Sequence, residues 1–332
     1  MNKDLSACCI YDGKPGNLNQ MRGLTKTLGI NYEIKKTELR FPWSILPAGI
    51  IPIHGLSFKN LDNFKFNSMP NIIISCGRRS ILQSIYLKKK YLTKIFTIHI
   101  LNPRISLNNF DLVITPKHDN VSGYNVINTD IALNHIDAGI VNEEKLKFSS
   151  YFKNIEKQIC TVLVGGESRN HKFGAKEAIE LSCKIKKLKK KINVKFIILF
   201  SRRTDESVKK ILRQEFHKDE DIWQKSENPY LSLMGYSKYI ICTSDSVSMI
   251  SESISSKKSV FIYKLPSKKV KNRVEDFVNT VIKKNYVKLL EENLFIFKSS
   301  YNDERNEIKK KIFNFYENYQ NRIESNDKKK YR

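Results

Sequence analysis

The chain has 332 residues, of which 40% are hydrophobic, enough for the cores of two domains of ordinary size. Its 59 lysines and arginines outnumber its 34 aspartates and glutamates, so the formal net charge is +25 at pH 7. No run of 18 or more apolar residues is present, which argues against a transmembrane helix, and the start of the chain is too short and polar for a signal peptide and already has the pattern of the first strand.

The positive charge favours anionic partners such as nucleic acid, an anionic membrane surface or phosphorylated substrates. Most of it is lysine spread along the chain beside abundant Asn and Ile, a pattern that the codons of an A/T-rich genome also produce. Since no nucleic-acid-binding module is recognisable, we expect no nucleic-acid partner and keep the membrane surface as an alternative. The six cysteines form no CxxC pair, so we predict neither a zinc site nor disulfides, and a cytoplasmic setting.

The first predicted strand, residues 8–11, runs into a glycine-rich turn and a helix that ends at Gly29. Two glycines let the backbone turn tightly and approach a ligand, although the turn matches neither a dinucleotide fingerprint nor a P-loop. We predict that the turn binds an acceptor substrate, with an ordinary strand-to-helix turn as the alternative. The predicted contacts are Gly13, Lys14, Gly16, Asn17 and Gln20, and Asp12 is a candidate catalytic base.

Residues 40–70 form an irregular connection with four prolines, a length that is usually functional. The strand at 71–76 then opens into an arginine pair and a helix to about residue 90, and the strand at 94–100 is followed by a second polar turn. Arginines at the carboxyl end of a strand are good anion ligands, with solvated arginines as the alternative. The predicted acceptor contacts in these turns are Arg78, Arg79, Asn102 and Arg104.

The strand at 110–115 is followed by His118 and Asp119. An imidazole at this place can act as a general base near neutral pH, so both residues are candidate catalytic bases. A histidine held structurally in a loop is the alternative. After a short strand at 124–129, the charged residues 143–157 are predicted to be a linker with a helix.

A second series of strands and helices follows. The strand at 159–164 leads into the compact turn Gly165–Gly–Glu–Ser168, which can wrap a phosphate, and the strand at 194–200 leads into Ser201–Arg–Arg–Thr204. Helices are predicted at 175–190 and 207–216. Asp219–Glu–Asp221 matches a DxD metal motif only formally, so we place it on the surface and predict no metal site.

Asn228 and Tyr230 precede a short helix at 231–237, and the strand at 239–242 then runs into the polar turn 243–246. Its hydroxyls and carboxylate can cap the next helix, whose N-terminus suits a phosphate. Glu252 lies about two turns into that helix, where it can accept hydrogen bonds from ribose hydroxyls. The alternative is a well-capped helix with a solvent-facing glutamate.

The last predicted helix is amphipathic, with Ile308, Ile312, Phe315 and Tyr319 on one face. The whole pattern predicts an α/β protein with two Rossmann-like domains facing across a cleft, as in the GT-B architecture. The predicted domains are 1–145 and 146–300. The helix 301–323 is expected to pack back on the first domain, and 324–332 to be a disordered basic tail.

Taken together, the turns resemble those of the mitochondrial fission ELM1 family of bacterial and plant proteins. Three departures occur: Ile131 stands where the family usually has glycine, Asn134–His135 stands near its His–Arg pair, and Gly235–Tyr–Ser–Lys238 differs from the usual Ala–Asp ending of the short helix at 231–237. The matching segments, in chain order, are GKPGNLNQMRGL (13–24), IISCGRRS (73–80), HILNPR (99–104), FDLVITPKHD (110–119), GYNVINT (123–129), VLVGGES (162–168), SRRT (201–204), NPY (228–230) and TSDSVSMISES (243–253).

The resemblance implies a GT-B-like fold with a nucleotide-sugar site. The first hypothesis is a cytoplasmic, metal-independent glycosyltransferase that uses a nucleoside-diphosphate sugar, without a further cofactor, on a membrane-associated envelope acceptor at the inner face of the cytoplasmic membrane. Plant members imply a second hypothesis, a non-catalytic adaptor on a membrane surface. The third is a nucleoside-diphosphate-sugar epimerase, for which the missing dinucleotide fingerprint is unfavourable.

For the transferase, we expect the second domain to bind the donor and the first domain the acceptor. The backbone N–H groups of the 165–168 turn would line the diphosphate, and the two arginines of the 201–204 turn would neutralise it as it leaves. The predicted donor residues are Gly165, Gly166, Ser168, Ser201, Arg202, Arg203, Asn228, Tyr230, Thr243, Ser244, Asp245, Ser246, Ser248 and Glu252.

Overall fold

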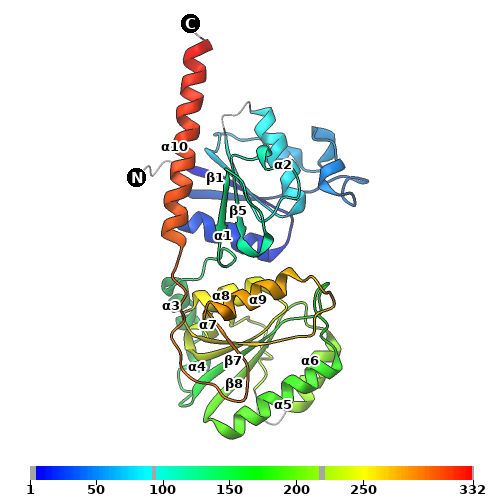
Figure 1. Cartoon of the computed structure of the whole chain (residues 1–332), viewed down its shortest axis with the longest axis vertical. Helices are drawn as coiled ribbons and strands as arrows, with labels where there is room; N and C mark the ends of the chain where they lie inside the picture. Colours follow the sequence, from blue (N-terminus) through cyan, green and yellow to red (C-terminus); the bar gives the residue numbers. More distant parts are fainter. Residues whose placement is uncertain (1–4, 92–94, 217–220, 331–332) are drawn as a thin grey trace. The chain divides into compact units, whose positions relative to one another are not determined.

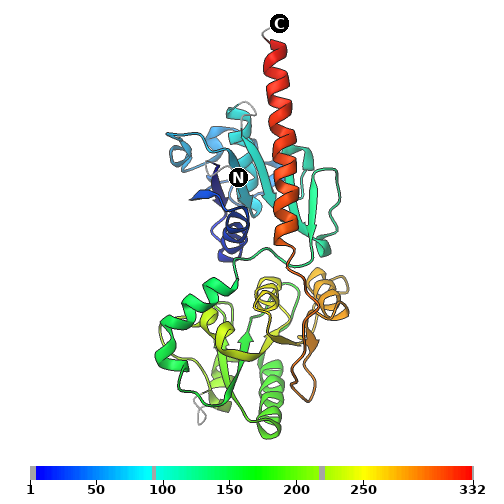
Figure 2. The same cartoon turned by 90° about the vertical axis from the view of Figure 1, so that its left-hand side faces the viewer.

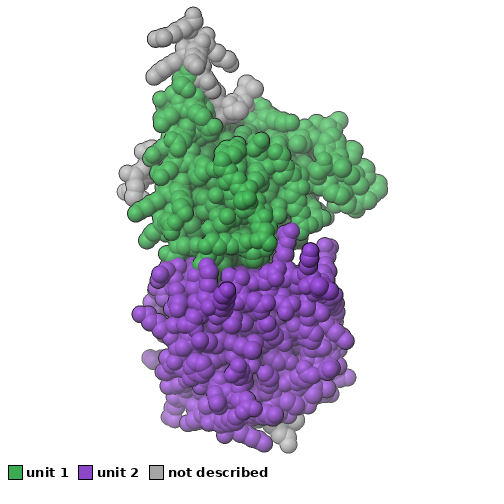
Figure 3. Space-filling view, in the orientation of Figure 1, with its two compact units in different colours: residues 1–135, 303–332 green, residues 136–302 purple. Residues whose placement is uncertain are grey.

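The structure, a computed structural model, describes residues 5–91, 95–216 and 221–330, the side chains of 326–330 excepted. It has two compact units (Figure 3). Unit 1 comprises residues 1–135 and 303–332, and unit 2 comprises residues 136–302. Each unit is built around its own parallel sheet, which confirms the predicted class of two Rossmann-like α/β domains.

Unit 1 contains a six-stranded sheet in the order β2-β1-β3-β4-β5-β6, all neighbours parallel (Figure 1). Its strands are β1 Ser6–Tyr11, β2 Asn31–Lys36, β3 Ile72–Cys76, β4 Phe96–Ile100, β5 Leu112–Pro116 and β6 Val126–Thr129. Its helices are α1 Pro15–Leu28, α2 Arg78–Lys90 and α10 Arg305–Lys330, with short 3-10 turns at Ala48–Ile50, Gly55–Ser57, Leu61–Phe64, Leu107–Asn109 and Lys117–Asp119.

Helix α1 forms where predicted because its ends carry strong local signals. Pro15 opens the helix, where its missing N–H is not needed, and Gly29 closes it in the left-handed conformation with φ 70°. Met21, Leu24 and Leu28 lie on one face and are buried. The helix therefore holds the turn after β1 at the carboxyl edge of the sheet.

Helix α10 packs on unit 1, as predicted (Figures 1 and 2). The rings of Tyr316 and Tyr319 lie 5.5 and 5.2 Å from that of Phe96 on β4. The buried face comprises Ile308, Ile312, Tyr316 and Tyr319, and the predicted Phe315 is partly buried and packs against the same core. Tyr316 was not predicted, although it lies four residues after Ile312 and shares its face. Residues 324–330 are helical rather than a disordered tail, in a segment without Gly or Pro.

Unit 2 contains a five-stranded parallel sheet in the order β11-β10-β9-β7-β8. Its strands are β7 Gln158–Val164, β8 Val194–Phe200, β9 Ser237–Thr243, β10 Ser259–Tyr263 and β11 Lys288–Leu289. Its helices are α3 Ala138–Lys147, α4 Ser149–Phe152, α5 Ala175–Lys191, α6 Glu206–Phe216, α7 Tyr230–Tyr236, α8 Val247–Ser255 and α9 Arg273–Lys283. Within the described ranges, no helix has the length and apolar character to span a bilayer.

The boundary between the units lies after residue 135, ten residues before the predicted one. Helix α3 accounts for the difference, since it packs against α7 of unit 2. Tyr236 donates a hydrogen bond to the Lys145 carbonyl (3.2 Å), and Gly235 lies against the side chains of Lys145 and Val141.

Candidate functional site

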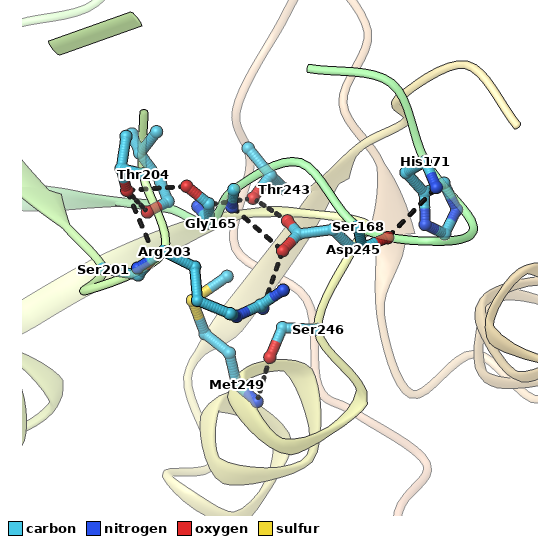
Figure 4. A network of polar contacts seen from close by, with 12 residues as sticks. Gly165, Ser168, His171, Ser201, Arg203, Thr204, Thr243, Asp245, Ser246 and Met249 are labelled. Carbon is cyan, nitrogen blue, oxygen red and sulfur yellow. Dashed lines mark hydrogen bonds and ion pairs between the residues drawn. The ribbon is translucent and has the colours of Figure 1, made fainter. Parts of the chain in front are cut away.

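The sheet of unit 2 changes direction between β7 and β9, since β8 follows on one side and β10 and β11 on the other. Ligands of open α/β sheets bind at such a switch point, beyond the carboxyl ends of the strands. Three predicted segments meet there: the loop after β7, the loop after β8 and the loop between β9 and α8 (Figure 4). The structure thus brings much of the predicted donor site together.

Asp245 connects the three loops. Its side chain is fully buried and accepts hydrogen bonds from the Gly166 N–H (3.1 Å) and the Thr243 hydroxyl (2.6 Å). It also forms an ion pair with the Arg203 guanidinium at 2.9 Å. The Thr243 hydroxyl in turn accepts the Gly165 N–H at 2.8 Å. Asp245 is therefore a positioning residue, with its carboxylate directed into the protein.

The two glycines after β7 are required by this arrangement. A Cβ atom on Gly165 would collide with the Asp245 carboxylate, and one on Gly166 would collide with the Arg203 carbonyl oxygen. The prediction that their N–H groups bind a diphosphate is wrong, because both already donate to Thr243 and Asp245. The sequence shows the glycines but not these acceptors, which come from the end of β9 and the loop after it, 78 and 79 residues away.

The loop after β8 is held in place by hydrogen bonds, while its two arginine side chains are exposed to solvent. Thr204, which the sequence did not single out, donates to the Gly165 carbonyl at 2.6 Å and lies 3.1 Å from the Ser201 hydroxyl. Arg202 is exposed, and the Arg203 side chain is 49% exposed despite its ion pair. Both guanidinium groups therefore lie where an anionic ligand can reach them.

Helix α8 begins beside these loops. Ser246 is its N-cap and accepts the Met249 N–H at 3.4 Å, while Ser248 lies half-buried in the first turn. Ser244 is buried and accepts the Leu265 N–H at 2.9 Å, which attaches the loop after β10 to the same edge. The N-terminus of α8 thus lies beside Arg203, which the ion pair with Asp245 holds there, and a helix N-terminus next to a cation is a suitable environment for phosphate.

Glu252 lies on the second turn of α8 and is only 5% exposed, so the solvent-facing alternative is wrong. Its carboxylate accepts a hydrogen bond of 2.6 Å from the Tyr230 hydroxyl. Burial, together with the Glu252 charge, raises the pKa of Tyr230 well above its ordinary value, so the phenol stays a donor. Asn228 is exposed and accepts the Tyr230 N–H at 3.2 Å, which fixes the start of α7.

Ser168 closes the loop after β7, where its hydroxyl accepts the N–H groups of Asn170 (3.1 Å) and His171 (3.0 Å) (Figure 4). His171 itself is buried, and the sequence analysis missed it. The only indication in the sequence was the position of this histidine, six residues after Gly165, the first glycine of the turn. Its burial could not be read from neighbours in sequence that are mostly polar.

The prediction that Asp221 lies on the surface is wrong. Its side chain is 2% exposed and forms ion pairs with Lys189 and, at 3.1 Å, with Lys195. Asp219 and Glu220 lie outside the described residues. In the described part of the chain, no group of three or more His, Cys, Asp or Glu side chains is arranged to hold a metal ion.

In unit 1 the corresponding switch point lies between β1 and β3. Asp12 accepts a hydrogen bond of 2.7 Å from the Asn17 amide and has Lys14 at 3.8 Å. Gly13 and Gly77 have φ values of 88° and 95°, and a Cβ atom on Gly77 would collide with Asn17 and Asp12. The structure therefore brings the predicted residues of the first glycine-rich turn to the start of α2.

The other predicted acceptor residues lie around this point. Arg78 and Arg79 are exposed at the start of α2, and Arg79 donates to the Ser44 carbonyl at 3.4 Å. Gln20 is buried rather than projecting, and its side-chain oxygen has no hydrogen-bond partner among the described residues. Gly16 lies in the first turn of α1, and Asn102 accepts the Arg104 N–H at 2.9 Å beyond β4.

The three candidate bases do not come together. His118 and Asp119 lie in the 3-10 turn after β5, where Asp119 accepts the Thr115 hydroxyl at 3.1 Å. Two strands, β3 and β4, separate β5 from β1 and Asp12, which at the usual strand spacing is about 14 Å. One substrate hydroxyl can thus meet Asp12 or the His118–Asp119 pair, but not both.

Comparison with known sequences identifies relatives. The sequence model of the family described as mitochondrial fission ELM1 matches residues 15–312. An uncharacterized protein of Rickettsia prowazekii (strain Madrid E) is 27% identical over 91% of this chain and 95% of its own length. Mitochondrial fission protein ELM1 of Arabidopsis thaliana is 27% identical over 58% of this chain, which spans 51% of that protein.

Among the solved structures that share the fold are two UDP-GlcNAc 2-epimerases. The UDP-GlcNAc 2-epimerase of Methanocaldococcus jannaschii is similar with a TM-score of 0.55 and 14% identity, over 94% of this chain and all of its own. The UDP-GlcNAc 2-epimerase of Neisseria meningitidis, bound to UDP-GlcNAc, has a TM-score of 0.50 and 15% identity over 95% of this chain and 93% of its own.

Proposed function

The chain belongs to the mitochondrial fission ELM1 family, and from that premise we propose that unit 2 binds a nucleoside-diphosphate sugar whose glycosyl group is transferred to an acceptor held by unit 1. The observation that carries the proposal is the meeting of three loops and the α8 N-terminus at the β7–β9 switch point. The Neisseria meningitidis enzyme, which has this fold, holds UDP-GlcNAc.

The diphosphate would lie at the N-terminus of α8, where free backbone N–H groups and the Ser246 and Ser248 side chains can donate to it. Arg202 and Arg203 would stabilise the negative charge that grows on the leaving diphosphate, a role that a divalent cation can also fill. Since Asp245 neutralises part of the Arg203 charge, Arg202 would carry the larger share. Gly165, Gly166, Thr243 and Asp245 would support these groups rather than touch the ligand.

Glu252 would accept hydrogen bonds from the ribose hydroxyls. A carboxylate that is 95% hidden from solvent needs donors, and Tyr230 supplies one at 2.6 Å. Tyr230 would therefore orient Glu252, and Asn228, exposed at the start of α7, would border the base. In unit 1 the acceptor hydroxyl would meet Asp12, which lies at the switch point with Asn17 and Lys14.

The first test is a thermal-shift screen with UDP, GDP, ADP, CMP, TDP, NAD and UDP-sugars. A ligand present at 100 times its dissociation constant stabilises the folded chain by about 2.7 kcal/mol, which is readily seen as a rise in Tm. We expect one class of nucleoside diphosphate to raise the Tm. Absence of any shift would reject the proposed donor site.

The same assay tests Glu252. The Glu252→Ala variant should weaken nucleotide binding about tenfold or more, because the ribose loses a charged hydrogen-bond acceptor. Glu180→Ala removes an exposed carboxylate from α5 of the same unit and serves as the matched control. Equal nucleotide affinity in the two variants would refute the assignment of Glu252.

Epimerisation of a nucleotide sugar is a second candidate, favoured by the two epimerases that share the fold. It would use the same donor site but no acceptor. The two functions separate on product analysis: incubation with a UDP-sugar alone would yield the epimer in one case, and transfer only in the presence of an acceptor in the other. A Tm shift with NAD alone would favour an epimerase that depends on a dinucleotide.

A membrane-surface adaptor is a third candidate. It is favoured by the segment between β2 and β3, where Phe41, Ile45, Ile50 and Leu56 are 65–76% exposed. Apolar side chains next to basic ones such as Arg40 suit the interface of an anionic bilayer. Retained vesicle binding with no nucleotide binding would favour this candidate.

A further inference from the structure

His171 is a buried histidine whose two ring nitrogens have different surroundings. The residue is 1% exposed, and its backbone is held by hydrogen bonds on both sides with Ser168. Its Nε2 lies 3.3 Å from the side-chain nitrogen of Asn272. Its Nδ1 is buried and has no hydrogen-bond partner in the described part of the chain.

The neighbouring asparagine decides which nitrogen carries the proton. Asn272 is the N-cap of α9, and its side-chain oxygen accepts the N–H groups of Val274 (3.0 Å) and Glu275 (3.4 Å). Its NH₂ group, which also lies 3.0 Å from the Ser267 hydroxyl and 3.3 Å from the Asn170 carbonyl, can only donate, so a proton on Nε2 would oppose it and the tautomer with the proton on Nδ1 is favoured. Burial lowers the pKa of His171 below its ordinary value, which keeps the ring neutral at pH 7.

The Nδ1–H group thus needs an acceptor, and His171 lines a small cavity in which one can be placed. The cavity measures about 10 Å³, the space for one oxygen atom with its hydrogen. It lies beyond the ends of β9 and β10 at the first turns of α9. Its walls are His171, Ser244, Lys264, Leu265, Glu275 and Val278.

We infer that this cavity receives a hydroxyl group of the sugar in the bound nucleotide sugar, with His171 Nδ1–H as its donor and the Glu275 carboxylate as its acceptor. The assignment rests on the proposed function and extends it to sugar recognition. Ser244 lines the cavity and lies two residues before Ser246, the N-cap of α8. The cavity is therefore close to the N-terminus of this helix. Lys264 can donate to a neighbouring hydroxyl of the same sugar.

The mixture of groups favours a hydroxyl over a phosphate oxygen. A phosphate would meet the Glu275 carboxylate as a like charge, whereas a hydroxyl accepts from one partner and donates to the other. A cavity for one oxygen atom is also too small for a phosphate group. A site that pairs buried polar groups with a substrate hydroxyl rejects analogues lacking it, since those groups are then left unpaired.

The test compares affinities for a nucleoside diphosphate and its sugar derivatives. Isothermal titration with UDP and a panel of UDP-sugars gives the ratio of the two dissociation constants for each protein. The variants are His171→Phe, which keeps a ring without nitrogens, His171→Asn, which keeps a donor near the Nδ1 position, and Glu275→Gln. Asp276→Asn, an exposed neighbour with the same charge change as Glu275→Gln, is the control.

We expect His171→Phe and Glu275→Gln to lose about tenfold of the preference for the sugar derivative, with UDP affinity within about twofold of the original. His171→Asn and Asp276→Asn should retain most of it. An unchanged preference in His171→Phe, with UDP still bound, would overturn the sugar assignment and leave the donor site standing. If the original protein binds neither UDP nor any other nucleotide or nucleotide sugar of the screen, the donor site and the sugar assignment both fall.

Discussion

Asp245 illustrates at the residue scale how a side chain can serve a site without touching the ligand. Its carboxylate holds the loops after β7 and β8 against the start of α8 through Gly166, Arg203 and Thr243. The cost of burying the charge is offset because all three partners are donors. A side chain on Gly165 or Gly166 would disturb the same contacts, because it would collide with the Asp245 carboxylate or the Arg203 carbonyl.

Gly166→Ala should destabilise unit 2 by about 2 kcal/mol or more, because the new Cβ atom would overlap the Arg203 carbonyl and force the loop after β8 to move. Gly174→Ala is the control, since there the nearest atom, Glu177 Oε2, lies at 3.6 Å. Urea denaturation followed by the fluorescence of Trp223 reports on unit 2 in a Trp43→Phe background. Equal midpoints for the two alanine variants would contradict the close approach.

His99 on β4 predicts a dependence of unit 1 stability on pH. The ring is buried, lies 2.8 Å from the Ser75 hydroxyl and stacks on Phe110 at 4.9 Å. Burial lowers its pKa from 6.5 to about 3. Between these values the unfolded chain binds a proton that the folded chain does not, so stability falls as the pH is lowered from 6.5 towards 3, by about 1.4 kcal/mol per pH unit.

The His99→Asn variant removes this titration but keeps a polar atom near Ser75. The slope of the unfolding free energy against pH between 6 and 4, followed by Trp43 fluorescence in a Trp223→Phe background, should become shallower by about 1.4 kcal/mol per pH unit. His54→Asn makes the same replacement at an exposed histidine of the same unit and is the matched control. A steep slope that persists in His99→Asn would assign the effect to other groups.

At the scale of elements, strands and their order of appearance could be predicted because buried parallel strands are short apolar runs rich in β-branched residues. The runs at 72–76 and 239–243 are examples. The hydrogen-bond partners of individual side chains could not be predicted, because they depend on which strands become neighbours in the sheet. Gly166 and Asp245 lie 79 residues apart, and only the pairing of β7 with β9 brings them together. His171 was missed for the same reason, since Asn272 lies 101 residues away.

Helix α10 is an element whose contribution can be measured. Ile312 is 1% exposed against the core of unit 1, so Ile312→Ala should lower the unfolding free energy of this unit by about 2–5 kcal/mol through lost burial and the cavity left behind. Asn314→Ala, on the exposed side of the same helix, should have little effect. Single-tryptophan backgrounds separate the units, with Trp43 reporting on unit 1. Identical unfolding curves for Ile312→Ala and Asn314→Ala would show that α10 does not stabilise unit 1.

At the scale of the whole molecule, the charge of +25 predicts association with anionic vesicles that weakens as salt is added, because the Debye length falls to about 10 Å at 0.1 M. If the segment between β2 and β3 enters the interface, Ile45→Ser should weaken this binding about tenfold, the equivalent of losing much of one buried aliphatic side chain. Ile179→Ser changes an exposed isoleucine of unit 2 and is the matched control. Co-sedimentation with phosphatidylserine vesicles measures both, and equal losses would exclude a specific role of the segment.

The return of α10 to unit 1 has a consequence for biosynthesis. The whole of unit 2 lies between the first sheet and the helix that covers it. At a translation rate of about 5–20 residues per second, roughly 9 to 37 s pass between completion of β6 and emergence of Ile312 and Tyr316. During that interval Phe96 and its neighbours lack their cover, whereas unit 2 is continuous in sequence and can finish folding. The nascent chain therefore completes its second unit before its first, and exposes an apolar surface that a ribosome-associated chaperone can bind.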